Sequence, residues 1–193
     1  WRIVPLSFFL TGTLLGFQGL WSGPYLYDVL NLSDVETGNI LLLLGIGSTA
    51  GFALSGWMAD RFGLARVLVA MSLIFIASQY ALALTPSAGA VRALYLVFGI
   101  TGAFNIMTVA QARQIFPLSM TGKAVSAVNV FSIGGTFLLQ WTMGLIIGAF
   151  PTNAAGQYPP LAYSAALAFT ATGALLSLIW YWPLLRSERR DAS

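Results

Sequence analysis

Six long stretches without any Asp, Glu, Lys or Arg constrain this chain more than any other feature of its 193 residues. They cover residues 4–27, 38–59, 67–84, 93–112, 124–150 and 161–185. A helix rises about 1.5 Å per residue and a bilayer core is about 30 Å thick, so about 20 residues cross it. The stretches are too long and too evenly apolar for the alternating strands of a membrane barrel. We therefore expect an all-α membrane protein with a bundle of six transmembrane helices.

Turn and capping residues lie in the short connections between these stretches. Ser33 and Glu36 form an S-x-x-E capping box, which predicts a helix that begins near Asp34. Pro86, Pro117 and the stretch from Pro151 to Pro160 interrupt the last three connections, and Pro183 is expected to end the last helix. No connection is long enough to separate two domains. We expect one bundle over residues 1–185 and a charged cytoplasmic tail outside the helix over residues 186–193.

The charged residues are segregated by side when the connections alternate across the membrane. One side receives only Arg92 of the Lys and Arg residues. The other side receives Arg2, Arg61, Arg66, Arg113, Lys123, Arg186, Arg189 and Arg190. The positive-inside rule then predicts that both termini are cytoplasmic. A multi-pass protein of the plasma (inner) membrane is expected.

Composition excludes several classes of function. The chain is 58% hydrophobic and 8% charged, whereas a soluble domain carries about a quarter charged residues. It has no Cys and no His, which excludes disulfides, thiol chemistry, imidazole ligands and His-dependent catalysis. The net charge of +3 reflects few ionisable groups rather than a basic surface, so no nucleic-acid partner is expected. We expect no enzyme activity, no metal and no cofactor.

The connection after the second stretch carries the most specific motif. It reads GWMADRFGLAR over residues 56–66 and contains Gly56, Asp60, Arg61, Gly63 and Arg66. This pattern resembles the GxxxDRxGxxR loop of the major facilitator superfamily, which joins the second and third helices of each six-helix half. The copy is degenerate, because Leu and Ala stand at 64 and 65 where basic residues are common. Apart from the family, Gly63 can adopt a positive φ, and Asp60 can accept hydrogen bonds from nearby helix amides or pair with Arg61 or Arg66.

The resemblance implies half of a facilitator fold with a three-plus-three inverted repeat, although no repeat is evident in the residues themselves. The degenerate motif is typical of the C-terminal half, and a start at Trp1 rather than Met favours a piece of a longer product. Such a half works with an N-terminal six-helix half as partner. It is expected to move a small polar or anionic organic solute by alternating access, with residues 56–66 as a gating loop. A simpler alternative is that the loop charges only orient the protein.

A second and weaker resemblance lies after the fourth stretch. Phe116 and Pro117 precede Gly122-Lys123-Ala124 there, as at the cytoplasmic start of the fifth helix of a facilitator half. Arg113 and Lys123 can equally satisfy the positive-inside rule alone.

Polar and aromatic residues inside the spans are the candidates for solute contact. Gln18, Trp21 and Tyr25 are spaced i, i+3 and i+7, which would place them on one helical face. Further candidates are Asn105, Gln111, Asn129 and Gln140, with Trp141 beside them. The resemblance implies that the first and fourth helices line a central cavity that the fifth flanks. The structural alternative is that amides hold helices together and that aromatic residues form an interfacial belt. No acid or base lies well inside a span, so the coupling ion is not indicated.

Paired glycines predict closely packed helices. The pairs are Gly12 with Gly16, Gly19 with Gly23, Gly47 with Gly51, and Gly144 with Gly148. An isolated half with such faces is expected to form homo-oligomers. The competing interpretation is a self-sufficient oligomeric six-span channel or scaffold. An aquaporin-like channel is excluded, because the sequence has no Asn-Pro-Ala loop.

Overall fold

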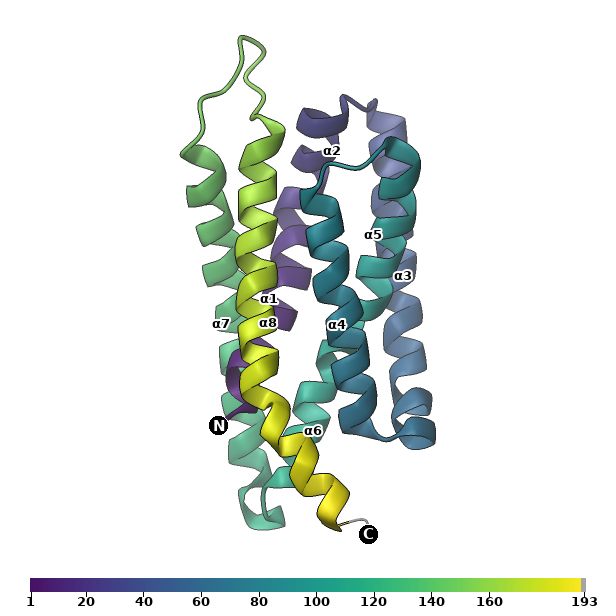
Figure 1. The fold of residues 1–193 in the computed structure, drawn as a ribbon, viewed down its shortest axis with the longest axis vertical. Helices are drawn as coiled ribbons and strands as arrows, with labels where there is room; N and C mark the ends of the chain where they lie inside the picture. Colours follow the sequence, from purple (N-terminus) through teal and green to yellow (C-terminus); the bar gives the residue numbers. More distant parts are fainter. Residues whose placement is uncertain (192–193) are drawn as a thin grey trace.

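The computed structural model describes residues 1–191, and describes side chains for residues 1–183. Within this part of the chain, six helical segments are long and apolar enough to cross a membrane. They are Ile3–Leu30, Asp34–Phe62, Leu64–Ala83, Ala88–Ile115, Leu118–Gly148 and Pro160–Pro183. Figure 1 shows them side by side in one bundle, with Trp1 and the last turns of α8 toward the same end. The expected six-span, all-α fold is confirmed.

Three of the six spans contain a segment that is not α-helical. The first consists of α1 (Ile3–Gly16), the π-helical turn η1 (Phe17–Trp21) and α2 (Ser22–Leu30). The second and third are α3 (Asp34–Phe62) and α4 (Leu64–Ala83). The fourth consists of α5 (Ala88–Gly102), the 3₁₀ turn η2 (Ala103–Ile106) and α6 (Met107–Ile115). The short 3₁₀ turn η3 (Leu118–Met120) leads into α7 (Thr121–Gly148), and α8 (Pro160–Asp191) completes the bundle.

Helix boundaries follow the local chemistry at most positions. The backbone N–H of Glu36 donates to Ser33 Oγ at 3.4 Å, and the N–H of Ser33 donates to Glu36 Oε2 at 3.2 Å. This confirms the predicted capping box and the start of α3. The prediction that Pro183 ends the last helix was wrong, because α8 continues to Asp191. Proline removes one backbone hydrogen bond, and a helix held by its neighbouring turns can kink there and continue.

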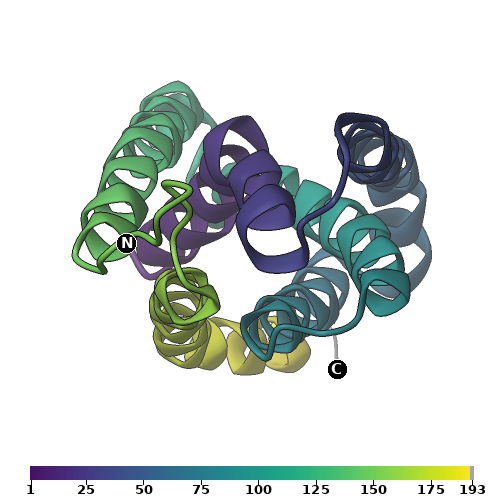
Figure 2. The ribbon, with the colours of Figure 1, turned by 90° about the horizontal axis from the view of Figure 1, so that it is seen from above.

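Helices of the first three spans pack against helices of the last three in the way that a three-plus-three repeat requires. α1 lies beside α7, α3 lies beside α5, and α4 lies beside α8 (Figure 2). If the first three spans are matched in order to the last three, the pair α1–α7 becomes α5–α3, and α4–α8 maps onto itself. The first and fourth spans each have 28 residues, and each is interrupted near its middle. These relations match the expected three-plus-three repeat, which lies in helix pairing rather than in recognisable residues.

Glycine permits the close approach in both related pairs. A Cβ atom on Gly12 of α1 would lie 2.7 Å from the backbone of Gly135 on α7. A Cβ atom on Gly51 of α3 would lie 2.2 Å from the carbonyl oxygen of Ile100 on α5. Not every predicted glycine contact forms, because Cβ atoms on Gly19 and Gly148 would meet nothing within 4 Å.

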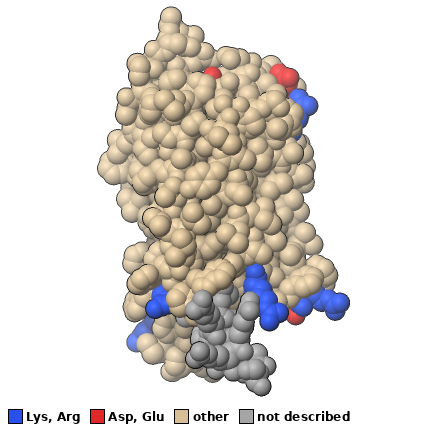
Figure 3. Space-filling model, viewed as in Figure 1, with Lys and Arg blue, Asp and Glu red and all other residues tan. Residues whose placement is uncertain are grey.

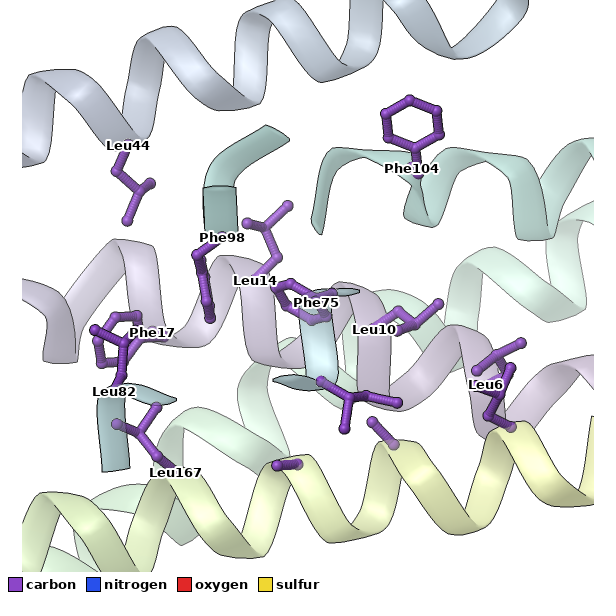
Figure 4. Packing of buried hydrophobic residues seen from close by; sticks show 14 of the residues in the cluster. Leu6, Leu10, Leu14, Phe17, Leu44, Phe75, Leu82, Phe98, Phe104 and Leu167 are labelled. Atoms are coloured by element: carbon purple, nitrogen blue, oxygen red, sulfur yellow. The ribbon is translucent and has the colours of Figure 1, made fainter. Parts of the chain in front are cut away.

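An aromatic cluster fills the core where the first, third and fourth spans meet. The ring centroids of Phe75 and Phe98 are 4.6 Å apart, and Phe98 lies 5.2 Å from Phe17 (Figure 4). Phe17 continues the cluster to Tyr25 at 6.2 Å and Tyr95 at 5.8 Å. All five side chains are fully buried. The cluster holds the first span against the third and fourth spans, at its π turn through Phe17 and after the turn through Tyr25.

Charge is concentrated at the two ends of the bundle (Figure 3). The basic end is defined by Arg2, Arg61, Arg66, Arg113 and Lys123, at the start of α1 and at the α3–α4 and α6–α7 connections. The acidic end is defined by Asp28, Asp34 and Glu36, at the α2–α3 connection. The apolar surface between these two ends is suited to contact with the hydrocarbon core of a membrane.

Candidate functional site

Two spans leave most of their surface uncovered by the rest of the bundle. In the most apolar windows of Asp34–Phe62 and Leu118–Gly148, only 33% and 28% of the residues are buried. The other four spans bury half or more of theirs. The uncovered sides of α3 and α7 flank the first span. Polar residues of the first span that reach this uncovered surface are therefore the first candidates for a binding site.

Gln18 lies in the π turn and is directed toward α3. Its side-chain oxygen accepts a long hydrogen bond of 3.5 Å from the hydroxyl of Ser48. Its backbone carbonyl accepts a bond of 3.0 Å from Ser22 Oγ. Gln18 is only partly buried, so its amide retains hydrogen-bonding capacity toward the uncovered face.

Trp21 and Gln140 are brought together on the other side of the first span. The indole Nε1–H of Trp21 donates to the backbone carbonyl of Gln140 at 2.9 Å. Both side chains line a depression of about 300 Å³ between the first span and α7. Its lining consists of Leu20, Trp21, Phe137, Gln140, Trp141, Gly144 and Leu145. Trp141 is 58% exposed, so its ring is available to a molecule in the depression.

Tyr25 lies on a different side of the first span from these residues. It is fully buried, and its hydroxyl donates to the Leu82 carbonyl of α4 at 2.8 Å. The predicted common face with Gln18 and Trp21 is therefore absent. The i, i+3, i+7 spacing assumes 3.6 residues per turn, whereas η1 is π-helical and rotates the following helix.

The remaining candidates are spread between the core and the surface. Asn105 lies in η2 and is buried, and its carbonyl accepts a bond of 2.7 Å from Thr108 Oγ1. Gln111 in α6 is also buried, whereas Asn129 on α7 is exposed. The structure does not bring these three side chains into the depression beside Trp21.

A buried hydroxyl network was missed by the sequence reasoning. The hydroxyls of Thr108 on α6 and Ser7 on α1 are hydrogen-bonded at 3.0 Å, and the Ser7 hydroxyl also contacts that of Ser132 on α7. All three residues are buried. Hydroxyls within apolar spans are the signal that indicates such links, but sequence does not show which of them meet.

The motif over residues 56–66 is a surface turn. Gly63 adopts a φ of 89°, as predicted, and its N–H donates to the Ala59 carbonyl at 2.9 Å. Asp60, Arg61 and Arg66 are exposed, and none makes an ion pair with another described residue. Of the two kinds of contact expected for Asp60, the pairing with Arg61 or Arg66 is absent from the described residues, and all three side chains are exposed at the basic end.

A second polar site, also missed, lies at the acidic end. Asp28 Oδ2 accepts hydrogen bonds from the Tyr163 hydroxyl at 2.6 Å and from the Tyr158 N–H at 3.2 Å. The Gln157 amide donates to the Tyr27 carbonyl at 3.4 Å and to Asn31 Oδ1 at 3.2 Å. The α7–α8 connection is thus bound to the end of α2. In sequence, Asp28 stands only as a charge that ends a span.

Comparisons with known proteins agree on one family. The family profile of the Major Facilitator Superfamily matches residues 5–193. The uncharacterized transporter y4wD of Sinorhizobium fredii is 27% identical over 152 residues, which are 77% of this chain and 37% of that protein. The arabinose-proton symporter of Bacillus subtilis is 27% identical over 130 residues, covering 65% of this chain and 28% of that protein.

The fold has a counterpart among solved structures. The xylose transporter XylE from E. coli, in an inward-open conformation, matches with a TM-score of 0.75 at 20% identity. The match covers 94% of this chain and 46% of that chain. This chain therefore spans less than half the length of each of these similar proteins.

Proposed function

The chain belongs to the Major Facilitator Superfamily, and from this premise we propose that it is the C-terminal half of a secondary active transporter. The proposed transporter moves a small polar or anionic organic solute by alternating access. Its partner is an N-terminal six-helix half of the same protein, in the plasma membrane. The observation that carries this proposal is the uncovered face of α7 and the first span, where Trp21 and Gln140 meet over an open depression.

The length and the uncovered surface support a missing partner half. The chain covers 46% of the xylose transporter, so a second unit of similar length completes such a protein. The least buried helices, α3 and α7, flank the first span on either side. A partner that packs against α3 and α7 would enclose Gln18 and the depression in a cavity between two halves.

The depression offers a solute one polar side chain in a mostly apolar lining. It combines one amide, Gln140, with the rings of Trp21 and Trp141, and no lining residue is charged. Amides hydrogen-bond hydroxyl and carbonyl groups, and indole rings offer flat apolar walls. Two of the similar proteins are named for arabinose and xylose, so sugars are the first solutes to test, followed by organic anions and amino acids.

Alternating access is supported by the interruptions of the first and fourth spans. η1 follows 14 residues of helix in one, and η2 follows 15 in the other. Discontinuous helices at corresponding places in two repeats are typical of transporter binding regions. The exposed loop with Gly56, Asp60 and Arg66 is free to contact the partner half as a gate. We place the basic end in the cytoplasm, together with both termini, by the positive-inside rule.

The test is uptake by cells that express the full-length parent, with a panel of radiolabelled sugars, organic anions and amino acids. For the solute that is transported, Gln140→Ala should reduce uptake at least several-fold, because it removes the one amide that lines the depression. Gln114→Ala is the matched control, since Gln114 is exposed near the basic end of α6. Equal effects of the two substitutions, or no uptake of any solute, would contradict the proposal.

A further inference from the structure

We propose that Trp21 is a positioning residue, which fixes the backbone of α7 at Gln140 and thereby places the Gln140 and Trp141 side chains. The inference deepens the proposed function and rests on it, because these side chains line the depression in which the solute would bind. Trp21 would then act on the solute through α7 as well as through its own ring.

The hydrogen bond from Trp21 is the first element of this role. Its Nε1–H meets the Gln140 carbonyl at 2.9 Å across 119 residues of sequence. Within a membrane, an indole N–H away from water needs a protein partner. A carbonyl inside a helix already accepts the amide four residues on, but it has a second lone pair for the indole. The bond therefore joins the first span to α7 without breaking α7.

Two glycines bring the first span and α7 close together beside this hydrogen bond. A Cβ atom on Gly144 would lie 2.9 Å from Cζ2 of Trp21, so the indole occupies the space of a side chain at 144. A Cβ atom on Gly16 would lie 3.4 Å from the backbone nitrogen of Gln140. The first span thus contacts α7 closely at two neighbouring points, with Gly16 at the Gln140 backbone and the Trp21 ring at Gly144.

The π turn explains why Trp21 reaches α7. η1 ends at Trp21, and its wider turn shifts the residues that follow by about 100° for each extra residue. Gln18 inside this turn is directed toward α3, whereas Trp21, three residues later at its end, is directed toward Gln140 of α7. A π turn is less stable than a regular helix and is frequent at functional sites. Here its effect is the placement of the indole.

Backbone hydrogen exchange tests the positioning without any solute. The full-length parent would be measured in detergent by mass spectrometry, with the peptide that covers residues 137–145 as the readout. Trp21→Phe keeps a ring and removes the donor, and Gly144→Ala displaces the indole without changing it. Both should speed exchange in this peptide several-fold. Gly148→Ala, where a Cβ atom meets nothing within 4 Å, should leave exchange unchanged. Unchanged exchange in both Trp21→Phe and Gly144→Ala would overturn the proposal.

Transport kinetics test the consequence for the solute. With the solute found in the uptake panel, Trp21→Phe and Gly144→Ala should each raise KM several-fold and leave the maximal rate within about twofold, because they misplace binding groups. Faster exchange with an unchanged KM would refute the link from α7 to solute binding. If no solute is transported by the unaltered protein, the proposed function fails, whereas the exchange result still decides whether Trp21 fixes α7.

Discussion

The hydroxyl of Tyr163 on α8 donates a 2.6 Å hydrogen bond to the carboxylate of Asp28 at the end of α2. The Tyr158 N–H donates to the same carboxylate oxygen at 3.2 Å. These bonds attach the α2 segment of the interrupted first span to the last helix and to the connection before it. Because an ionised acceptor strengthens a hydrogen bond, this contact is expected to stabilise the acidic end.

Tyr163→Phe should therefore lower the stability of the purified protein by about 1.5–3 kcal/mol, the usual contribution of a hydrogen bond to a charged group. Thermal unfolding in detergent measures this as a lower midpoint. Tyr80→Phe is the matched control, since the Tyr80 hydroxyl makes its 2.8 Å bond to Thr172 at an exposed position. That control should change stability by about 0.5 kcal/mol or less. Equal unfolding midpoints for the two variants would contradict the prediction that the Tyr163–Asp28 hydrogen bond stabilises the acidic end.

Gly51→Ala should weaken the α3–α5 pair. The added methyl group would lie 2.2 Å from the Ile100 carbonyl oxygen, so the two backbones must separate. Overpacking of this kind costs about 1–3 kcal/mol. Gly45→Ala on the same helix meets nothing within 4 Å and should be neutral or slightly stabilising. The same unfolding measurement decides, and an unchanged midpoint for Gly51→Ala would contradict the close packing.

Asp60→Asn should reduce transport by the full-length parent several-fold without lowering stability. The carboxylate is exposed and makes no ion pair with a described residue, so the substitution removes no described contact of the bundle. Its proposed contact is with the partner half. Arg186→Gln, a charge change near the end of α8, should reduce uptake less. Equal losses of uptake for the two variants, or no loss for either, would contradict a gating role. The charges of the loop would then serve only to orient the protein in the membrane.

The isolated chain should self-associate in detergent. Its α3 and α7 faces are largely uncovered, and they combine apolar residues with the polar groups of the depression. Light scattering with the detergent mass subtracted gives the protein mass directly. Dimers or larger species are expected, and a strictly monomeric mass would count against this surface as an interface.

Sequence reasoning located the spans because lipid excludes charge from them, and this signal is strong along the whole chain. It located the start of α3 because the S-x-x-E spacing of Ser33 and Glu36 is typical of a capping box at a helix N-terminus. It failed at Tyr25, because a π turn leaves no mark in the apolar pattern. It failed at Pro183, because a proline removes only one backbone hydrogen bond and the helix can continue past it.

The candidate site was predicted in part. Trp21, Gln140 and Trp141 were proposed from residue type, and the structure brings them to one depression. Their hydrogen bond spans 119 residues and depends on two glycines that bring the backbones together, which no local pattern predicts. The Ser7, Thr108 and Ser132 network was missed for the same reason, since each hydroxyl can also bond within its own helix.

The central claim, that this chain is half of a transporter, is tested most directly by expressing it with and without the other half. Uptake of the radiolabelled panel would be measured for the chain alone, for the N-terminal half alone, and for both as separate polypeptides. The account predicts uptake only when both halves are present. Uptake by this chain alone would contradict the account and identify a self-sufficient oligomeric carrier or channel.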